Sequence, residues 1–544
     1  MSSSASLLLA MWFGLAGLEP VAKSQVTPAK DTMPFTGLSP AKISPTLCVL
    51  RYRVSTSSAE CQAHFDQGLG YFYSYVWMEA ARSFETATRH DPECALAWWG
   101  LSRALERWGK GTHNKALEKA SQLQTRASHK EQLLILARMQ EKGLSANVGD
   151  SEQRRKAAIK TIDELLALYD ADEEGWYYRA QLSGGAGLFG GEVSSVPYYK
   201  ALVRINPLHP GANHELLHFY EKFHRPALGW LYAEKYIESS PGIPHPFHMQ
   251  AHLATRLGRW DKTSDRSARA IELERAYHKE MNVKPKDDHQ YSHHLEILTL
   301  SLIHDGRFRE ADAVKDEAER SDLHLWTTWF RLYLAERNWD QALKMAEHFR
   351  KTDKLTASYL TALVHLKRGD FSEASPQVEV LRQAYQERKE DSTLAYRVWE
   401  TQGTLLCGNG DPDSGLKLLA KAADKSKTDY SHHSWGNGAY YMEAWGVEAL
   451  RTGRNEIAEE AFLEALAHDP GSVRAALGLQ VLCERLGRTE EANRYAQLAR
   501  RAWRKADPNS FSAEMALLRT ESSLTKSPRA QSEPHTGPPR GTGE

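Results

Sequence analysis

The chain contains few cysteines, and no two of them have the spacing of a shared site. Five cysteines occur among 544 residues, at positions 48, 61, 94, 407 and 483. There is no CxxC pair and no CxxCH haem-attachment motif, which argues against the common thiolate and c-type haem sites. An odd number of scattered cysteines also does not fit the dense disulfide framework of small secreted domains.

An excess of charge of either sign is also missing. The sequence has 69 Lys and Arg against 70 Asp and Glu, and its pI is about 7.1. A protein that binds nucleic acid or an anionic membrane surface electrostatically carries a basic excess. We therefore expect no nucleic-acid partner.

Long hydrophobic runs are absent after the first 24 residues. One apolar stretch, Leu7 to Leu18, is twelve residues long, which suits the h-region of a secretory signal better than a membrane span. Ala22 and Ser24 have the small side chains of a cleavage site. The first residues lack the usual basic n-region, so an uncleaved anchor or a different start codon is the alternative. We predict a signal peptide over 1–24, export to the periplasm or another extracytoplasmic compartment, and no later membrane span; a cytoplasmic protein is the alternative.

Composition divides the rest of the chain into segments. Residues 25–58 are rich in Pro, Ser and Thr and predict a linker, and residues 522–544 predict a disordered tail. The glycine-rich run at 183–191 lacks a following GK[ST] motif and predicts a flexible break rather than a phosphate loop. We expect helical blocks over 59–182, 183–320 and 321–521.

Histidines recur with a fixed period in the middle block. His214 and His218 are four residues apart, as are His248 and His252, and 34 residues separate the two pairs. A four-residue step places both side chains of a pair on one face of a helix. A period of 34 residues is that of the tetratricopeptide repeat (TPR), a helix-turn-helix unit.

The small, aromatic and turn residues of that repeat recur elsewhere. Gly68 and Ala80 would let two helices approach closely, and Phe84 would fill the space between them. A second clear copy contains Trp445, Gly446, Gly453, Ala458, Phe462, Ala465 and Pro470. The chain resembles TPR proteins over most of its length, in roughly eleven copies between about 61 and 505. The resemblance implies an all-α solenoid that forms a right-handed superhelix.

In TPR proteins the first helix of each repeat lines a concave groove, and positions 2, 5, 9, 12 and 13 face the ligand. When Pro207, Gly258 and Gly306 fix the register, the histidines fall on this face. The residues placed there are His214, His218, Glu221, His245, His248, His252, His293 and Glu296. Since only 23 of 544 residues are histidine, chance explains this coincidence poorly.

This pattern predicts a metal site. Packed helices lie about 8–10 Å apart, so imidazoles from neighbouring first helices can converge on one point. Zinc, copper and iron all accept imidazole ligands, and Glu221 could add an oxygen or orient an imidazole. The predicted ligands of a divalent Zn, Cu or Fe ion are His214, His218, Glu221, His248, His252 and His293. In the alternative, the histidines form a polar floor that hydrogen-bonds to backbone and acidic groups.

Other side chains are candidates for contact with a ligand in the groove. They are His209, His245, Glu296, Trp98, Trp176 and Tyr177. Packing between helices is the main interpretation of the aromatic ones, and stacking on a ligand is the alternative.

Two further motifs have competing interpretations. HELLH at 214–218 matches the HExxH zincin signature, with Glu215 as general base. However, Glu215 falls off the groove face, and the zincin sheet has no place among helical repeats. His432 and His433 precede a late repeat, and we interpret them as a capped helix entry rather than a second site.

The histidine motifs support a finer resemblance. The order HPGANHELLHFYE, HPFHMQAHL and YSHHLEIL resembles a group of bacterial TPR proteins with HPGAxHxxxHxxE and HMxxH motifs. Gln250 and Ala251 replace the Pro-Ser that is usual inside HMxxH, and YSHHLEIL replaces a more usual Tyr-x-x-His-Asn.

The favoured function is an exported TPR scaffold that binds a protein or peptide partner in its groove, with the histidines holding a metal or shaping the floor. One alternative is a metal-dependent enzyme or metal-handling protein, in which Glu221 or Glu296 would act as base. The other is a purely structural assembly scaffold. A non-enzymatic protein is favoured, and the fold by itself does not decide between them.

Overall fold

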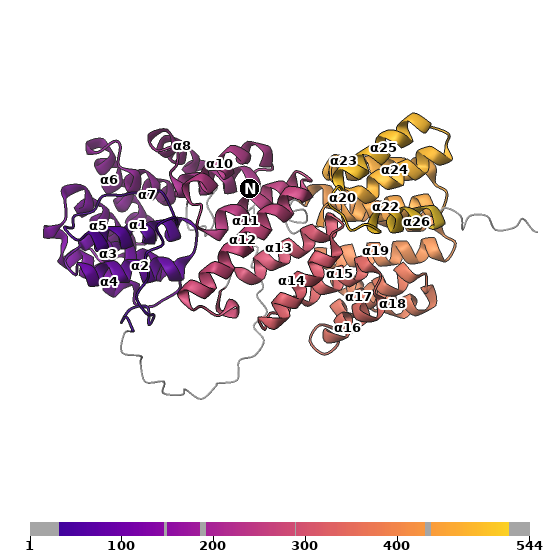
Figure 1. The fold of residues 1–544 in the computed structure, drawn as a ribbon, viewed down its shortest axis with the longest axis horizontal. Helices are drawn as coiled ribbons and strands as arrows, with labels where there is room; N and C mark the ends of the chain where they lie inside the picture. Colours follow the sequence, from indigo (N-terminus) through magenta and orange to yellow (C-terminus); the bar gives the residue numbers. More distant parts are fainter. Residues whose placement is uncertain (1–31, 146–148, 185–191, 289, 430–436, 522–544) are drawn as a thin grey trace, which may run out of the picture.

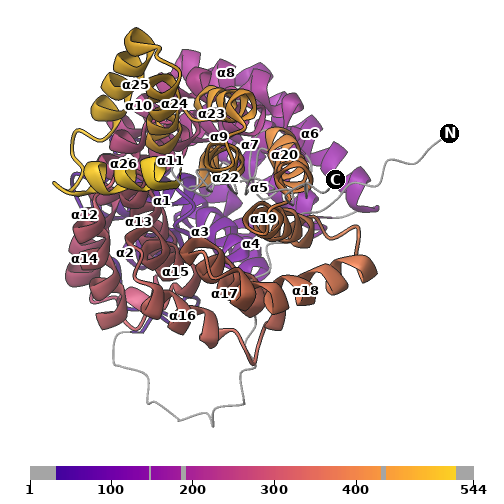
Figure 2. The same ribbon diagram turned by 90° about the vertical axis from the view of Figure 1, so that its right-hand side faces the viewer.

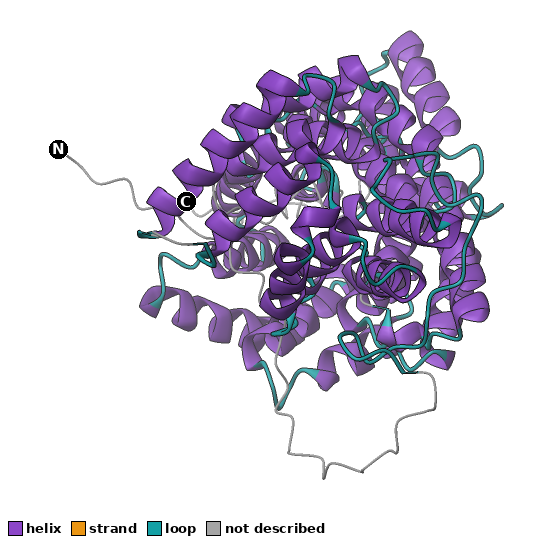
Figure 3. Cartoon of the chain, turned by 90° about the vertical axis from the view of Figure 1, so that its left-hand side faces the viewer, coloured by secondary structure: helices purple, strands orange, loops and turns teal. Residues whose placement is uncertain are grey.

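The computed structural model describes residues 32–145, 149–184, 192–288, 290–429 and 437–521, and these ranges contain helices and no strand (Figure 3). None of the described helices is both long enough and apolar enough to cross a membrane. The predicted signal peptide, the core of the glycine-rich run, His432, His433 and the C-terminal tail lie outside the described residues.

Helix follows helix along the described chain, and helices pack on their sequence neighbours, except that α26 packs mainly on α24 and α22. The N-terminal helices are α1 (Ala59–Tyr73), α2 (Trp77–His90), α3 (Ala95–Arg107), α4 (His113–Gln122), α5 (His129–Lys142), α6 (Ser151–Leu168), α7 (Glu173–Ser183) and α8 (Val196–Ile205). The middle helices are α9 (Pro210–Lys222), α10 (Pro226–Ser239), α11 (Pro244–Arg256), α12 (Trp260–Met281), α13 (Tyr291–His304) and α14 (Phe308–Arg320). The next helices are α15 (Trp326–Glu336), α16 (Trp339–His348), α17 (Lys354–Arg368), α18 (Phe371–Glu387), α19 (Ser392–Gly408) and α20 (Pro412–Thr428). The last helices are α22 (Tyr440–Arg451), α23 (Asn455–His468), α24 (Val473–Arg485), α25 (Thr489–Ala502) and α26 (Ser510–Glu521), and short 3₁₀ helices η1 (Gln124–Arg126), η2 (Val193–Ser195) and η3 (Pro285–Asp287) lie in connections.

Aromatic side chains that lie against glycines set the spacing of helices at both ends of the chain. A Cβ on Gly68 would lie 2.7 Å from the ring of Phe84, and one on Gly100 would lie 2.6 Å from it. Phe462 has the same relation to the C-terminal glycines Gly446 and Gly478, at 2.6 and 2.4 Å. In each case a phenyl ring fills a space that only a missing side chain leaves open. The predicted all-α solenoid of helix-turn-helix units is confirmed.

The solenoid curves back on itself twice. The N-terminal helices curve until α9 meets α1, which precedes it by more than a hundred residues. Figure 2 shows that the C-terminal half also curves round, with α13, α15, α19 and α22 toward the inside and α14, α16 and α18 toward the outside. The segment after α25 thereby reaches the start of α12 and the turn between α13 and α14. The middle helices are therefore held from both ends of the chain (Figure 1).

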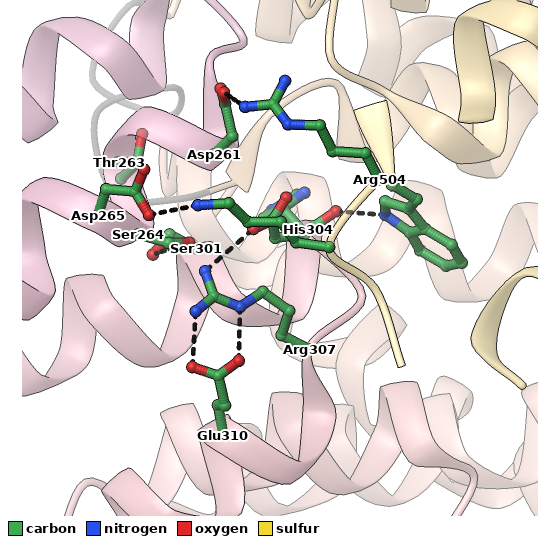
Figure 4. Close-up of polar contacts among 12 residues, drawn as sticks. Asp261, Thr263, Ser264, Asp265, Ser301, His304, Arg307, Glu310 and Arg504 are labelled. Carbon is green, nitrogen blue, oxygen red and sulfur yellow. Dashed lines mark hydrogen bonds and ion pairs between the residues drawn. The ribbon is translucent and has the colours of Figure 1, made fainter. Parts of the chain in front are cut away.

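Polar contacts close the C-terminal curve against the middle helices (Figure 4). Arg504 pairs with Asp261 at the start of α12, and Trp503 Nε1 donates to His304 O at 2.7 Å. Nearby, Trp260 Nε1 donates to both carboxylate oxygens of Asp469, at 3.1 and 3.0 Å. The Trp260 ring also stacks on His304, with centroids 3.8 Å apart. The start of α12 and the end of α13 are thus fixed by residues 199 to 243 positions later in the chain.

The segment predicted to be a linker is a packed arm over residues 33–54. Met33, Leu50 and Val54 are at most 4% exposed. Glu85 on α2 accepts hydrogen bonds from the backbone of Phe35 and Thr36. The linker prediction for 25–58 is therefore wrong for this part. A Pro- and Ser-rich composition suggests a linker, but it does not show whether the apolar residues within the segment pack on a helix. Further along, the arm pairs with the end of α10, where Val49 N donates to Ser239 O at 2.8 Å.

Candidate metal centre

The motif HPGANH forms the start of α9 and sets how close this helix lies to α1. His209 is the N-cap, and its Nδ1 accepts a hydrogen bond from Ala212 N at 3.1 Å. Pro210 occupies the first turn, where its missing N–H has no cost. Gly211 faces α1, and a Cβ there would lie 2.5 Å from Tyr73 and 2.7 Å from Tyr177. Glycine is therefore needed for the close approach that brings the next turn of α9 against the end of α1.

The predicted histidines lie together, but they form two groups rather than one. The first group is His214 and His218 from α9 with His245 from α11, and the second is His248 and His252 from α11 with His293 from α13. In each group, one nitrogen per ring lies within 4.8 Å of the other two. We call these groups the first triad and the second triad.

In the first triad, the backbone fixes which nitrogen of His214 can bind a ligand. His214 Nδ1 lies 2.7 Å from the carbonyl oxygen of Tyr73, and a carbonyl only accepts, so Nδ1 carries the proton. The neutral ring then presents the lone pair of Nε2, which lies 3.1 Å from His245 Nε2. Ordering of a ligand imidazole by a hydrogen bond to its far nitrogen is a common feature of metal sites.

Tyr75 covers the first triad on the side of α1. Its ring centroid lies 4.5 Å from that of His214, 6.0 Å from that of His218 and 5.9 Å from that of His245. Tyr75 has a positive φ of 59°, a conformation that costs energy for a residue other than glycine. The turn after α1 is thus held in an unfavourable conformation that places this ring on the histidines.

In the second triad, a carboxylate has the role that a carbonyl has in the first. His252 Nδ1 lies 3.3 Å from Glu221 Oε1, so Nδ1 donates and Nε2 carries the lone pair. His252 Nε2 lies 2.8 Å from His248 Nε2. His293 completes the group, and its ring centroid is 4.8 Å from that of His248. The side chain of His293 is 30% exposed, which makes it the most accessible of the six histidines.

Glu221 lies between the triads and belongs to neither. Its Oε1 also accepts from Arg256 Nε at 2.9 Å, and its Oε2 lies 3.8 Å from His218 Nδ1. Burial raises the pKa of Glu221, but hydrogen bonds from His218 and His252 and the charge of Arg256 hold it well below its usual value. Of the two roles that the sequence left open, the contacts therefore favour orientation of histidines over ligation.

Burial makes His214, His245, His248 and His252 weak bases. It holds the pKa of His214, His245 and His248 well below the usual value, and neighbouring imidazoles lower all three further. It also lowers the pKa of His252, although the Glu221 carboxylate opposes this effect. Neutral imidazole is the form that binds a metal ion.

The structure adds residues that the sequence prediction missed. His245 was expected only as a groove contact, although its place three residues before His248 on α11 is a signal for the same face. His294 is 1% exposed, its Nδ1 is 2.7 Å from Glu274 Oε1, and its ring centroid lies 4.1 Å from that of His248. It lies behind the second triad. Nothing in the sequence indicates the contacts of Tyr73 and Tyr75, which depend on the return of α9 to α1.

Most of the predicted groove contacts are packing or capping residues in the structure. His209 is fully buried as the N-cap of α9, and Tyr177 is 1% exposed. Trp98 Nε1 donates to Pro92 O at 3.0 Å, and Trp176 Nε1 donates to Asp170 O at 2.6 Å, so both indoles fix turns. These contacts favour packing for the three aromatic side chains and capping for His209, and contact of the four with a ligand stays a prediction. Glu296 remains beside the centre, with its Oε2 3.6 Å from His293 Nδ1.

Glu215 of the HELLH motif has its carboxylate bound to the turn after α1 and to α7. Its Oε1 accepts from Tyr75 Oη at 2.9 Å and from Tyr177 Oη at 3.2 Å. Burial raises its pKa, and the side chain is 3% exposed or less. These contacts are those of a structural carboxylate that anchors Tyr75, rather than those of a zincin base.

Comparisons with known proteins agree with this architecture. A sequence profile described as tetratricopeptide repeat matches residues 65–128, 327–388 and 443–509, so these three segments contain TPR repeats. The helices that carry the two triads, α9, α11 and α13, lie outside the matched segments. No curated protein matches the chain. The finer resemblance to bacterial proteins with HPGAxHxxxHxxE and HMxxH motifs stays a prediction.

Two solved structures of TPR proteins are similar to this chain. The crystal structure of the yeast Tom70 is 13% identical, covers 86% of this chain and 96% of that chain, and has a TM-score of 0.33. The crystal structure of the P58(IPK) TPR domain is 11% identical, covers 81% of this chain and 99% of that chain, and has a TM-score of 0.23. These TM-scores are low, so the likenesses add no argument to the one that the repeats provide. Over the residues that the structure describes, the chain is an all-helical solenoid, and TPR repeats occur in the three matched segments.

Proposed function

We propose that this protein is a TPR scaffold that binds transition-metal ions through the two histidine triads on its middle helices. The observation that carries the proposal is the fixed orientation of two imidazoles. The Tyr73 carbonyl directs the Nε2 lone pair of His214 into the first triad, and Glu221 directs that of His252 into the second. Hydrogen bonds to a carbonyl and a carboxylate would also fit a polar floor, and metal binding is favoured because three imidazole nitrogens converge within 4.8 Å of one another in each triad.

The donor set limits the kind of ion. Three imidazole nitrogens without a carboxylate ligand suit Zn, Cu or Fe and do not suit Mg or Ca, which take oxygen ligands. His245 Nδ1 and His248 Nδ1 have no hydrogen-bond partner among the described residues. An unpartnered buried ring nitrogen is a position at which a metal ion could bind.

Elemental mass spectrometry on protein purified without a His tag tests the proposal. The wild type should contain about two ions per chain when both sites are filled, and His214→Ala/His248→Ala should contain close to none, because it removes one ligand from each triad. His129→Ala/His324→Ala is the matched control, since both residues lie away from the triads on the exposed surface. Circular dichroism should show that both variants keep their helices. No metal in the wild type, or equal metal in both double variants, would contradict the proposal.

A protein or peptide partner remains part of the proposal, because TPR repeats are interaction modules in other proteins. Helix α26 packs on α22 and α24, and its Glu514 pairs with Arg474 and Arg337. The chain's own last helix therefore covers part of these repeats. A partner that binds there has to displace α26, so it should bind more tightly to a chain that ends at residue 509. Equal affinity of the full and the shortened chain would place the partner elsewhere.

We propose no catalytic step. Glu221 and Glu296, the two carboxylates expected as general bases, lie beside His252 and His293 respectively. Export, which was predicted from the first 24 residues, stays a proposal because that segment lies outside the described residues.

A further inference from the structure

We propose that the two triads form one dinuclear centre, in which a small anion bridges two metal ions. The inference rests on the proposed metal binding and goes beyond it, because two metal sites on one scaffold need not share a bridging ligand. Its basis is that the triads share a helix, share a carboxylate and each supply only three nitrogens.

Helix α11 supplies ligands to both triads from one face. His245 belongs to the first triad and His248 to the second, and their ring centroids lie 5.9 Å apart. Three residues of an α-helix rise about 4.5 Å, so His245 lies about one helical turn from His248, the nearest α11 ligand of the second triad. Two-metal sites in hydrolases and polymerases have ions about 3.5–4 Å apart, so a dinuclear centre requires each ion to lie on the side of its triad where His245 and His248 face each other.

Glu221 connects the triads from the side of α9. One of its oxygens lies 3.3 Å from His252 Nδ1, and the other lies 3.8 Å from His218 Nδ1. A single buried carboxylate therefore faces one histidine from each triad. The negative charge compensates for positive charge at both sites, which lowers the energy of holding two cations close together.

Each triad leaves part of the coordination sphere to another ligand. Zinc and copper prefer four or more ligands, and within the described residues each grouping of potential ligands has three members. Tyr75 covers the first triad, and His294 lies behind His248 in the second. The more exposed rings are His218 at 18% and His293 at 30%, so a ligand can reach the two triads from solvent on this side. The remaining positions thus suit a ligand of the size of hydroxide or azide.

Electron paramagnetic resonance of the copper-loaded full chain tests this arrangement. Metal is removed with a chelator, Cu(II) is added, and bound copper is counted separately from unpaired spins. We expect about two Cu(II) per chain and a coupled spectrum with a half-field signal, or a spin count well below the copper count. Addition of azide should change the spectrum at about one azide per pair of ions.

Single-triad variants provide the reference spectra. His293→Ala leaves the first triad intact and His218→Ala leaves the second, so each should bind about one Cu(II) with a full, uncoupled spin. His324→Ala should retain the coupled spectrum, since this exposed residue lies outside both triads.

Two bound ions with two full, uncoupled spins in the wild type would overturn the dinuclear arrangement and leave metal binding intact. No bound copper, or copper that does not depend on either triad, would refute the proposed metal function itself. Circular dichroism and melting of each variant distinguish loss of a ligand from loss of the fold.

Discussion

Replacement of Glu221 by Gln is the sharpest single test of how this centre is built. The substitution keeps the size of the side chain and one acceptor oxygen, but it removes the charge that faces His252, His218 and Arg256. Glu221 and Arg256 are 9% and 7% exposed in their side chains, so water cannot replace the lost interaction. The low pKa of Glu221 means that the charge is present throughout the neutral range.

Two separate losses are expected from Glu221→Gln. Removal of one partner from a buried ion pair costs about 3–5 kcal/mol, and we expect the lower end because Gln still accepts one hydrogen bond. Loss of a group that orients a ligand imidazole typically weakens metal binding by about 10- to 100-fold. The first loss is measured as denaturant unfolding of the metal-free chain, and the second as competition for Zn(II) with a chromophoric chelator.

Glu238→Gln is the matched control for this prediction. Glu238 lies on α10, is 53% exposed and pairs with Lys235 at 2.7 Å. An exposed pair of this kind contributes about 0–1 kcal/mol, so stability and Zn(II) affinity should change little. If Glu221→Gln bound Zn(II) as tightly as Glu238→Gln does, the argument that Glu221 orients the second triad would be refuted.

Three further predictions concern the elements that place the centre. Gly211→Ala should lower the free energy of unfolding by about 1–3 kcal/mol, because its Cβ would contact the tyrosines of α1 and α7. Gly111→Ala should change that free energy by no more than about 0.5 kcal/mol, since a Cβ there has nothing within 4 Å. Equal melting of the two variants would contradict the close approach of α9 to α1. Burial lowers the pKa of His209 to about 3, so its contribution to stability is complete above the unfolded value near 6.5 and is lost as pH falls from there toward 3, by about 1.4 kcal/mol per pH unit. His209→Asn keeps an N-cap acceptor, and its melting temperature should therefore fall less steeply between pH 7 and 5 than that of the wild type; parallel curves would show that His209 does not titrate this way. The packed arm over 33–54 should resist trypsin at Arg51 in the native protein, although the Arg51 side chain is 68% exposed. Intact-mass analysis measures the cleavage, and rapid cleavage at Arg51 would restore the linker interpretation.

The sequence by itself determined the repeat and the face of each helix. A 34-residue period and a four-residue step are local properties, because the rise and twist of a helix convert spacing directly into a shared face. For this reason His214 and His218 lie on one face of α9, and His248 and His252 on one face of α11. The positions of Phe84 and Phe462 against glycines follow from the same local pattern, since each lies on a helix next to its glycines in the chain.

Only the tertiary structure decided how the faces meet. The division into two triads, with His245 in the first and Glu221 outside both, depends on the angle between neighbouring repeats, which no single-repeat pattern contains. The proton on His214 Nδ1 is fixed by Tyr73, which lies 141 residues earlier. The packing of the arm over 33–54 depends in the same way on helices that are distant in sequence. Contacts of this kind arise when the solenoid curves back on itself, so their physical cause is the sum of many small packing angles along the chain.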